Sequence, residues 1–175
     1  MNQKYIITGA PGTGKTSIIN ELNNRGFNCI RETSREIISE QIAKGGDILP
    51  WKNQIAFENK IANMRTKQYL KSTEKSVYFF DRSAIDCIAY LRLNNIQPTS
   101  EIIQAVKKCK FNKTAFYTPI WEKIYTNDNE RKEKLDQAKK IEMHLLYTYI
   151  KKGYKLIEVP RNSIINRTDF ILSQI

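Results

Sequence analysis

Short apolar runs of strand length alternate along this chain with longer segments in which apolar residues recur at helical spacing. The apolar runs predict five strands, at residues 5–8, 27–31, 77–80, 113–117 and 154–159. The longer segments predict seven helices, at residues 16–25, 34–44, 51–70, 85–93, 101–108, 135–151 and 164–172. Strands that alternate with helices favour a parallel sheet covered by helices on both faces, which is a three-layer α/β/α fold. In such folds right-handed crossovers bring ligands to the carboxyl ends of the strands.

The composition fits one domain spanning residues 1–175, which is long enough to bury a sizeable core. Hydrophobic residues make up 41% and charged residues 27%, and this balance argues against a disordered chain. No apolar run approaches the roughly 20 residues needed to cross a bilayer, so we expect no membrane partner. The three cysteines are widely spaced and in no metal-ligand pattern, which indicates a reducing compartment and a cytoplasmic protein.

The net charge is strongly basic, with 29 lysines and arginines against 18 acidic residues, which gives +11 at pH 7. Such a surface suits phosphorylated ligands or nucleic acid. The basic residues are interleaved with acidic ones, and this pattern favours an ordinary solvated surface over a binding tract. No recognisable RNA- or DNA-binding module accompanies the charge, so nucleic acid is left open as a partner but is not expected.

A complete phosphate-binding motif, G-x-x-x-x-G-K-[ST], follows the first predicted strand and opens the first predicted helix. Its glycines let successive backbone N–H groups point at phosphate oxygens, and the helix N-terminus adds partial positive charge. We expect Lys15 to reach the β- and γ-phosphates of ATP and the Thr16 hydroxyl to bind Mg²⁺. The predicted nucleotide-binding residues are Gly9, Ala10, Pro11, Gly12, Thr13, Gly14, Lys15, Thr16 and Ser17.

A P-loop needs an acidic partner at the end of a neighbouring strand to hold the magnesium shell. The apolar run at residues 77–80 is followed by Asp81, which we predict to bind Mg²⁺ through water. The alternative is structural, because Asp81 or Ser83 can cap the helix that follows. The two roles are compatible, so the sequence predicts a metal-site carboxylate at this strand end.

The sequence also indicates which class of P-loop protein this chain resembles most. GTPases recognise guanine with Asn-Lys-x-Asp, and the Asn-Lys pair at residues 112–113 lacks the aspartate. A motor ATPase of the AAA+ type needs a larger core and a helical lid domain, for which 175 residues leave little room. A small phosphotransferase needs only a sheet, an acceptor pocket and a mobile basic lid, so the length favours that design.

Residues 81–83, Asp-Arg-Ser, resemble the Asp/Glu-Arg-Ser motif of deoxynucleoside and thymidylate kinases, whose arginine touches the transferred or acceptor phosphate. The P-loop and five further segments together resemble a bacterial family of small P-loop AAA-domain ATPases. Those segments are residues 31–36, 45–51, 80–86, 119–125 and 130–131. That family is similar to the nicotinamide riboside kinase domain of bacterial NAD regulators. The resemblance spans nearly the whole chain and implies a five-stranded sheet in the kinase order 2-3-1-4-5. In nicotinamide riboside kinases the corresponding aspartate is not followed by arginine, so that substrate is not implied.

The resemblance assigns acceptor roles to three charged residues. In the nucleoside kinases that this chain resembles, a glutamate in the place of Glu32 accepts the proton of the attacking hydroxyl. The alternative for Glu32 is an exposed glutamate at a helix start, which the helix dipole favours. Arg35, one turn further, would face the same cleft and bind acceptor or phosphate, or else form a surface ion pair with an acid such as Glu32. Arg82 would contact the acceptor.

Residues 120–134 lie where P-loop kinases carry their lid, and this segment is densely charged. Arg131 would neutralise charge on the transferring phosphoryl group there, although dense charge also marks ordinary solvated faces. Arg161, after the fifth predicted strand, falls where related kinases contact the nucleotide base. It would stack on adenine, or lie in water as a loop arginine.

The sequence therefore predicts a P-loop phosphotransferase that uses ATP and Mg²⁺ and moves the γ-phosphoryl group to a small nucleoside- or nucleotide-like acceptor. The alternative is a regulatory ATPase whose nucleotide state controls binding to a protein or RNA partner. Glu32 and Arg82 separate the two hypotheses, because a switch needs neither an acceptor base nor an acceptor-facing arginine.

Overall fold

The structure is a computed structural model that describes residues 3–73, 76–122 and 135–175. Its centre is a five-stranded parallel sheet in the order β2-β3-β1-β4-β5, which confirms the predicted strand order. The strands are β1 (Lys4–Thr8), β2 (Asn28–Ile30), β3 (Tyr78–Asp81), β4 (Thr114–Tyr117) and β5 (Lys155–Glu158). Each predicted strand agrees with the structure to within one residue at both ends.

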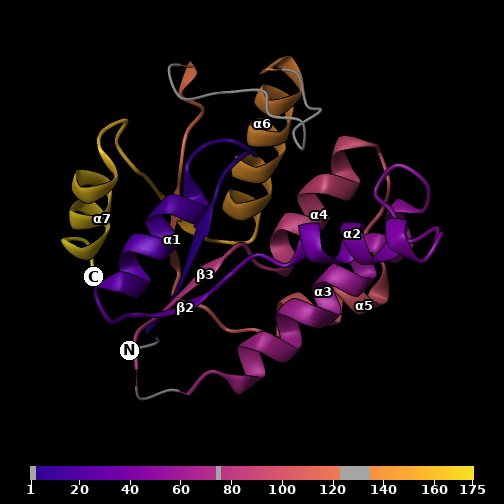
Figure 1. The fold of residues 1–175 in the computed structure, drawn as a ribbon, viewed down its shortest axis with the longest axis horizontal. Coiled ribbons are helices and arrows are strands. Elements are labelled where there is room, and N and C mark those ends of the chain that lie inside the picture. Colours follow the sequence, from indigo (N-terminus) through magenta and orange to yellow (C-terminus); the bar gives the residue numbers. More distant parts are fainter. Residues whose placement is uncertain (1–2, 74–75, 123–134) are drawn as a thin grey trace.

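The helices of the described residues follow the predicted alternation with the strands (Figure 1). They are α1 (Lys15–Asn24), α2 (Ser34–Ala43), α3 (Gln54–Lys71), α4 (Ala84–Leu93), α5 (Ser100–Lys108), α6 (Leu135–Lys151) and α7 (Ile164–Leu172). The largest difference from prediction is the start of α3, three residues later than expected. There the Asn53 side chain caps the helix by accepting a hydrogen bond from the Ala56 N–H (3.2 Å). Within the described residues, no helix has the length and hydropathy of a membrane span.

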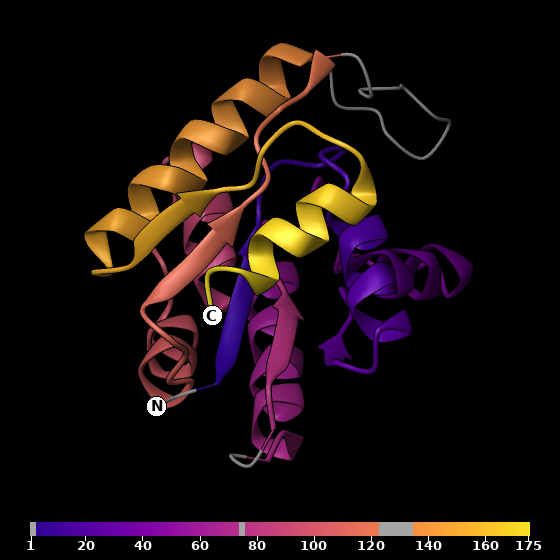
Figure 2. The same ribbon diagram turned by 90° about the vertical axis from the view of Figure 1, so that its left-hand side faces the viewer.

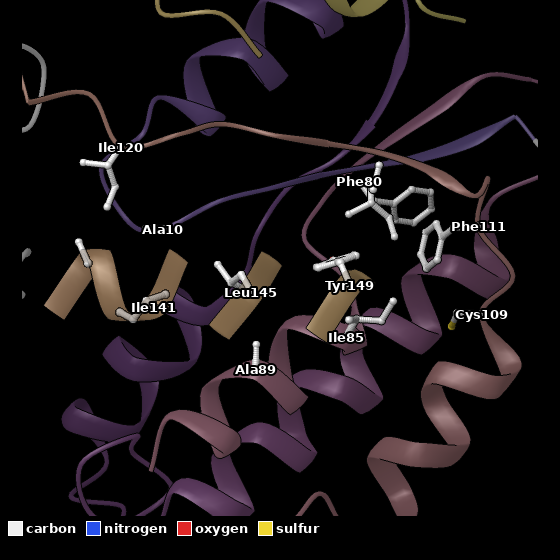
Figure 3. Close-up of a cluster of buried hydrophobic side chains, with 13 residues drawn as sticks. Ala10, Phe80, Ile85, Ala89, Cys109, Phe111, Ile120, Ile141, Leu145 and Tyr149 are labelled. Atoms are coloured by element: carbon white, nitrogen blue, oxygen red, sulfur yellow. The ribbon is translucent and has the colours of Figure 1, made fainter. Parts of the chain in front are cut away.

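Alternate side chains of the strands point to opposite faces of the sheet, and helices cover both faces. Ile6 of β1 and Phe80 of β3 pack with α4 and α6, in the cluster of buried side chains drawn in Figure 3. Their strand neighbours Ile7 and Phe79 point the other way and pack with α1 and α7. Figures 1 and 2 show the resulting layers, with α1 and α7 side by side on one face and α4 and α6 on the other.

A second core joins α2, α3, α4 and α5 to one another. Its buried side chains include Ile37 of α2, Ile61 of α3, Leu91 of α4 and Ile102 of α5. Because α4 is buried along most of its length and packs in both cores, it links this group of helices to the sheet. The second core therefore fixes α2 and α3 beside the carboxyl end of β2, which α2 follows directly.

The register of the sheet brings three sequence-distant segments to one edge. Beyond the strand ends, the Arg82 N–H donates to the Ile7 carbonyl (3.0 Å), and the Thr118 N–H donates to the Thr8 carbonyl (2.8 Å). The P-loop that follows β1, the segment after β3 and the segment after β4 thus lie together. This is the edge at which the sequence places its candidate site.

Candidate active site

The P-loop leads from β1 into α1 with a backbone that favours glycine. Gly9, Gly12 and Gly14 have φ angles of 149°, 80° and 85°. A Cβ at Gly9 would lie 2.4 Å from Thr118 Oγ1, so a larger residue does not fit without displacing the segment after β4. Gly14 is the N-cap of α1. Because glycine has no side chain to occupy the first N–H groups of the helix, those groups stay available to a bound anion.

Lys15 is buried inside the P-loop, and its ammonium group donates to the Ala10 carbonyl (2.7 Å). The Thr13 hydroxyl donates to the same carbonyl (2.9 Å) and contacts the Thr118 hydroxyl (2.6 Å). Burial and the charge of Arg82 lower the pKa of Lys15 to about 7, against the opposing effect of nearby acids. A polyphosphate beside this ammonium group would raise its pKa and hold it charged.

Asp81, the last residue of β3, is a buried carboxyl next to the P-loop. Burial raises the pKa of Asp81 to about 6, although the Lys15 ammonium group lowers it. The Oδ1 atom has no hydrogen-bond partner among the described residues. A buried oxygen without a partner fits a Mg²⁺ shell shared with Thr16 and phosphate oxygens, since Mg²⁺ takes few protein ligands at such sites. The described residues contain no group of three or more His, Cys, Asp or Glu side chains that could hold a metal.

Arg82 has a left-handed backbone, with a φ angle of 73°, which is uncommon outside glycine. Its buried guanidinium pairs with Asp86 (Nη1 to Oδ1, 3.2 Å) and with Glu32 (Nε to Oε2, 3.0 Å). The Nε–H is not directed at Glu32, so that second contact is electrostatic. The next residue, Ser83, accepts a hydrogen bond from the Ile85 N–H (3.1 Å), so Ser83 and not Asp81 caps α4.

Asp86, for which the sequence predicts no role of its own, is a fully buried carboxylate at the centre of a polar network. It accepts hydrogen bonds from the Thr8 hydroxyl (2.7 Å), the Tyr149 hydroxyl (2.5 Å) and the Ser83 N–H (2.9 Å). The network joins the end of β1, the start of α4 and the helix α6 around the Arg82 guanidinium. The available signal was the spacing Ser-x-x-Asp, which is a capping box with aspartate in place of glutamate.

Glu32 lies two residues after β2 and faces two arginines. Besides Arg82, the Arg65 guanidinium approaches it, with Nη2 3.6 Å from Oε1, and the Ser34 hydroxyl donates to the same carboxylate. Burial raises the pKa of Glu32, but the charges of Arg82, Arg65 and Lys15 outweigh burial and lower it to about 2. Glu32 is therefore a partly buried, ionised carboxylate in an ion-pair cluster, and the exposed helix-start alternative is wrong.

A cavity of about 270 Å³ connects the P-loop to this cluster. The P-loop and the exposed Thr16 and Ser17 line it on one side, and Glu32 and Arg82 line it on the other. Arg35 is also part of the lining and has an exposed side chain. The apolar part of the wall comes from α2, α3 and the segment before α3: Ile38, Pro50, Phe57 and Ile61. The structure thus brings the predicted phosphate and acceptor residues together around one space.

Glu58 and Arg65, both on α3, line the cavity and were missed by sequence reasoning. Burial raises the pKa of Glu58 to about 7, opposed by a hydrogen bond with the Cys87 thiol and by the Arg65 charge. Arg65 donates to the Ser83 carbonyl (2.7 Å). The two residues lie seven positions apart, which is two helical turns, on the inward face of α3. Charged residues at the spacing of an apolar helix face were the one signal that could have found them.

Arg161 lies between β5 and α7 with about half of its side chain exposed. Its Nε–H donates to the Ile120 carbonyl (3.0 Å), and its Nη1 pairs with Glu158 (3.0 Å). These contacts join the β5–α7 loop to the start of the predicted lid, and stacking on adenine stays a prediction. Arg131, with the lid from residue 123 onward, lies outside the described residues.

Three structures of known proteins share this fold over nearly the whole chain. Deoxyadenosine kinase from M. mycoides is 16% identical with a TM-score of 0.71, and the match covers 98% of this chain and 97% of that one. Thymidylate kinase from Candida albicans is 14% identical with a TM-score of 0.64, and the match covers 99% and 91%. The NadR protein in complex with NR is 14% identical with a TM-score of 0.71. That match covers 98% of this chain but 50% of the NadR chain.

Sequence comparison gives the family of the chain. No curated protein sequence matches it. The family model for an AAA domain matches residues 4–167, from the start of β1 into α7, and so includes the P-loop, Asp81, Arg82 and the cavity. With the parallel sheet in the order shared by P-loop kinases, this match shows that the chain belongs to the AAA-domain family and has a kinase-like P-loop fold.

Proposed function

We propose that this chain is an ATP-dependent phosphotransferase that moves the γ-phosphoryl group to a small nucleoside- or nucleotide-like acceptor. The observation that carries the proposal is the cavity that begins at the P-loop and continues to Glu32, Arg82 and the apolar face of α3. Its volume of about 270 Å³ lies just below the usual range for small-molecule sites, so it suits only a compact acceptor beside the phosphates. A protein that only hydrolyses ATP as a switch does not need an enclosed space at this position.

The P-loop side of the cavity would bind the triphosphate. The N–H groups at the start of α1 and the Lys15 ammonium group face this side, and Thr16 is exposed at its mouth. Thr16 and Asp81 would hold Mg²⁺, which neutralises charge that develops on the phosphate oxygens during transfer. The Asp81 Oδ1 atom supports this assignment, because it is buried and has no hydrogen-bond partner in the part of the chain that the structure describes.

Glu32 and Arg82 would act on the acceptor. Phosphoryl transfer has a loose transition state in which the attacking hydroxyl loses its proton late, so its protein partner mainly orients it. A carboxylate whose pKa is about 2 suits that task, because it stays ionised and accepts a hydrogen bond without removing the proton early. Arg82, fixed by Asp86 from behind, would contact the acceptor or the transferred phosphoryl group.

The far wall of the cavity supports a nucleoside-like acceptor. Phe57 and Ile61 offer an apolar surface for a flat heterocycle, while Glu58 and Arg65 offer polar atoms from the same helix. Arg35 would add positive charge at the entrance. Arg131 on the lid and Arg161 beside it are proposed to contact the transferring phosphoryl group and the adenine, respectively.

The experiment that tests the proposal measures acceptor-dependent turnover. The protein is incubated with labelled ATP, Mg²⁺ and pools of nucleosides, nucleotides and vitamins, and any labelled product is identified. The assay is repeated with Glu32→Gln and with the control Glu40→Gln, an exposed glutamate of α2 paired with Lys44. We expect Glu32→Gln to lower transfer by roughly 10²- to 10⁴-fold at near wild-type ATP affinity, and the control to match wild type.

Two outcomes would contradict this proposal in different ways. Acceptor-stimulated turnover that survives Glu32→Gln would remove Glu32 from the mechanism but keep the kinase. ATP hydrolysis that no small molecule stimulates would favour the regulatory ATPase whose nucleotide state controls a protein or RNA partner.

A further inference from the structure

Arg167 of α7 is a buried arginine that contacts the P-loop from behind. Its side chain is 3% exposed, and its Nη2 donates to the Thr13 carbonyl (2.9 Å). Thr13 lies 154 residues away in the sequence. The contact is possible because α7 packs against α1, the helix that the P-loop opens (Figure 2).

The charge of Arg167 has no acidic partner in the described part of the chain. Arg82 and Arg65 pair with carboxylates in the cavity, and Arg25, which also joins α1 to α7, pairs with Glu21 and Asp169. For Arg167, burial lowers the pKa and no acid raises it, and the Nε–H lacks a hydrogen-bond partner in the described residues. Burying an unpaired cation is costly, so an anion nearby would relieve it.

The Thr13 carbonyl is a point from which one side chain can set the shape of the loop. Thr13 stands between Gly12 and Gly14, which adopt left-handed φ angles of 80° and 85°. Because glycine has no Cβ, the backbone can rotate on both sides of Thr13. In a planar trans peptide the carbonyl and the following N–H point in opposite directions. When Arg167 holds the Thr13 carbonyl toward α7, it therefore turns the Gly14 N–H away from α7.

We propose that Arg167 is a positioning residue of the nucleotide site. It fixes the peptide between Thr13 and Gly14 so that the Gly14 N–H faces the polyphosphate, and it adds a positive charge that no acid of the described residues neutralises. The ligand class that this arrangement recognises is a polyphosphate anion, whatever base is attached. The inference rests on the proposed function, because it concerns the triphosphate side of the same cavity.

The test measures polyphosphate binding by calorimetry in wild type, Arg167→Met and Arg167→Lys, with ATP·Mg²⁺ and inorganic tripolyphosphate as probes. A hydrogen bond from a charged donor is commonly worth on the order of 10- to 100-fold in an equilibrium constant, and this is the most that affinity can lose when the loop is no longer held in its binding shape. We expect a loss of about this size for both probes in Arg167→Met. A smaller loss is expected in Arg167→Lys, which keeps the charge. Arg25→Met is the control, because it removes the other arginine between α1 and α7 without touching the P-loop.

The outcomes separate positioning from packing. If Arg167→Met and Arg25→Met lose thermal stability alike and bind tripolyphosphate alike, Arg167 only docks α7 and the proposal is wrong. If Arg167→Met loses ATP but not tripolyphosphate, the residue acts on the base and the proposal is again wrong. If Arg167→Met does not fold, the comparison of Arg167→Lys with wild type decides, and equal affinities overturn the proposal. A wild-type protein that binds neither probe overturns the proposed function itself.

Discussion

The substitution Glu58→Gln tests the electrostatics of the cavity wall, because it replaces a buried carboxyl with a neutral group of the same shape. Glu58 is 5% exposed, and burial raises its pKa from the ordinary 4.5 to about 7. Between these two values the folded protein binds a proton that the unfolded chain releases. Stability therefore falls as pH rises from about 4.5 to about 7, and is level above that.

The size of the effect follows from the same two pKa values. An interval from 4.5 to about 7 corresponds to about 3 kcal/mol of lost stability at pH 8, and to less than about 1 kcal/mol at pH 5. Glutamine cannot ionise, so Glu58→Gln escapes this loss. We expect the free energy of unfolding of the variant, relative to that of wild type, to rise by about 2–3 kcal/mol from pH 5 to pH 8.

Urea unfolding of both proteins at pH 5 and pH 8 measures this gain as a change in the midpoint at constant slope. Glu40→Gln is the matched control. A hydrogen bond with Lys44 lowers the pKa of Glu40. Glu40 is therefore ionised in the folded and the unfolded protein above about pH 5.5, and its contribution to the free energy of unfolding hardly changes from there to pH 8. If the stability difference between Glu58→Gln and wild type is the same at both pH values, Glu58 does not titrate in this range and the reasoning is refuted.

Three further substitutions probe the other parts of the site. Lys15→Ala is expected to abolish the binding of ATP·Mg²⁺, measured by calorimetry. The variant should stay folded, because the substitution also removes a buried ammonium group that is costly to the fold. Undiminished binding would contradict the P-loop assignment. Tyr149→Phe removes one hydrogen-bond donor to Asp86. It is expected to lower the free energy of unfolding in urea by about 1–3 kcal/mol and to lower the kcat for transfer. Unchanged stability would show that the Asp86 network does not depend on the Tyr149 hydroxyl. Arg131→Ala is expected to lower kcat on the order of 10²- to 10³-fold while raising the KM for ATP less; an unchanged kcat would place Arg131 on a solvated face.

The sequence predicted the features that depend on residues close together in the chain. The strands and helices follow from apolar periodicity and glycine stops. The P-loop follows from a motif in which neighbouring residues act together, and the prediction for Asp81 follows from the apolar run that precedes it. Glu58, Arg65 and Arg167 could not be found that way, because their roles depend on how α3 and α7 pack against the P-loop. Hydrophobic periodicity gives the buried face of a helix but not which distant loop that face meets. A buried charge on such a face is visible in the sequence, but its partner is not.

The central place of β1 in the sheet has a consequence for hydrogen exchange. All five of its residues are buried and it is hydrogen-bonded on both sides, to β3 and β4. Its amides therefore open only when most of the molecule unfolds, whereas the short edge strand β2, with three partly or fully exposed residues, opens at lower free energy. The P-loop is thus anchored in the slowest-exchanging part of the sheet, and Glu32 follows one of the faster-exchanging parts. Local opening beside Glu32 can occur while the P-loop keeps its shape.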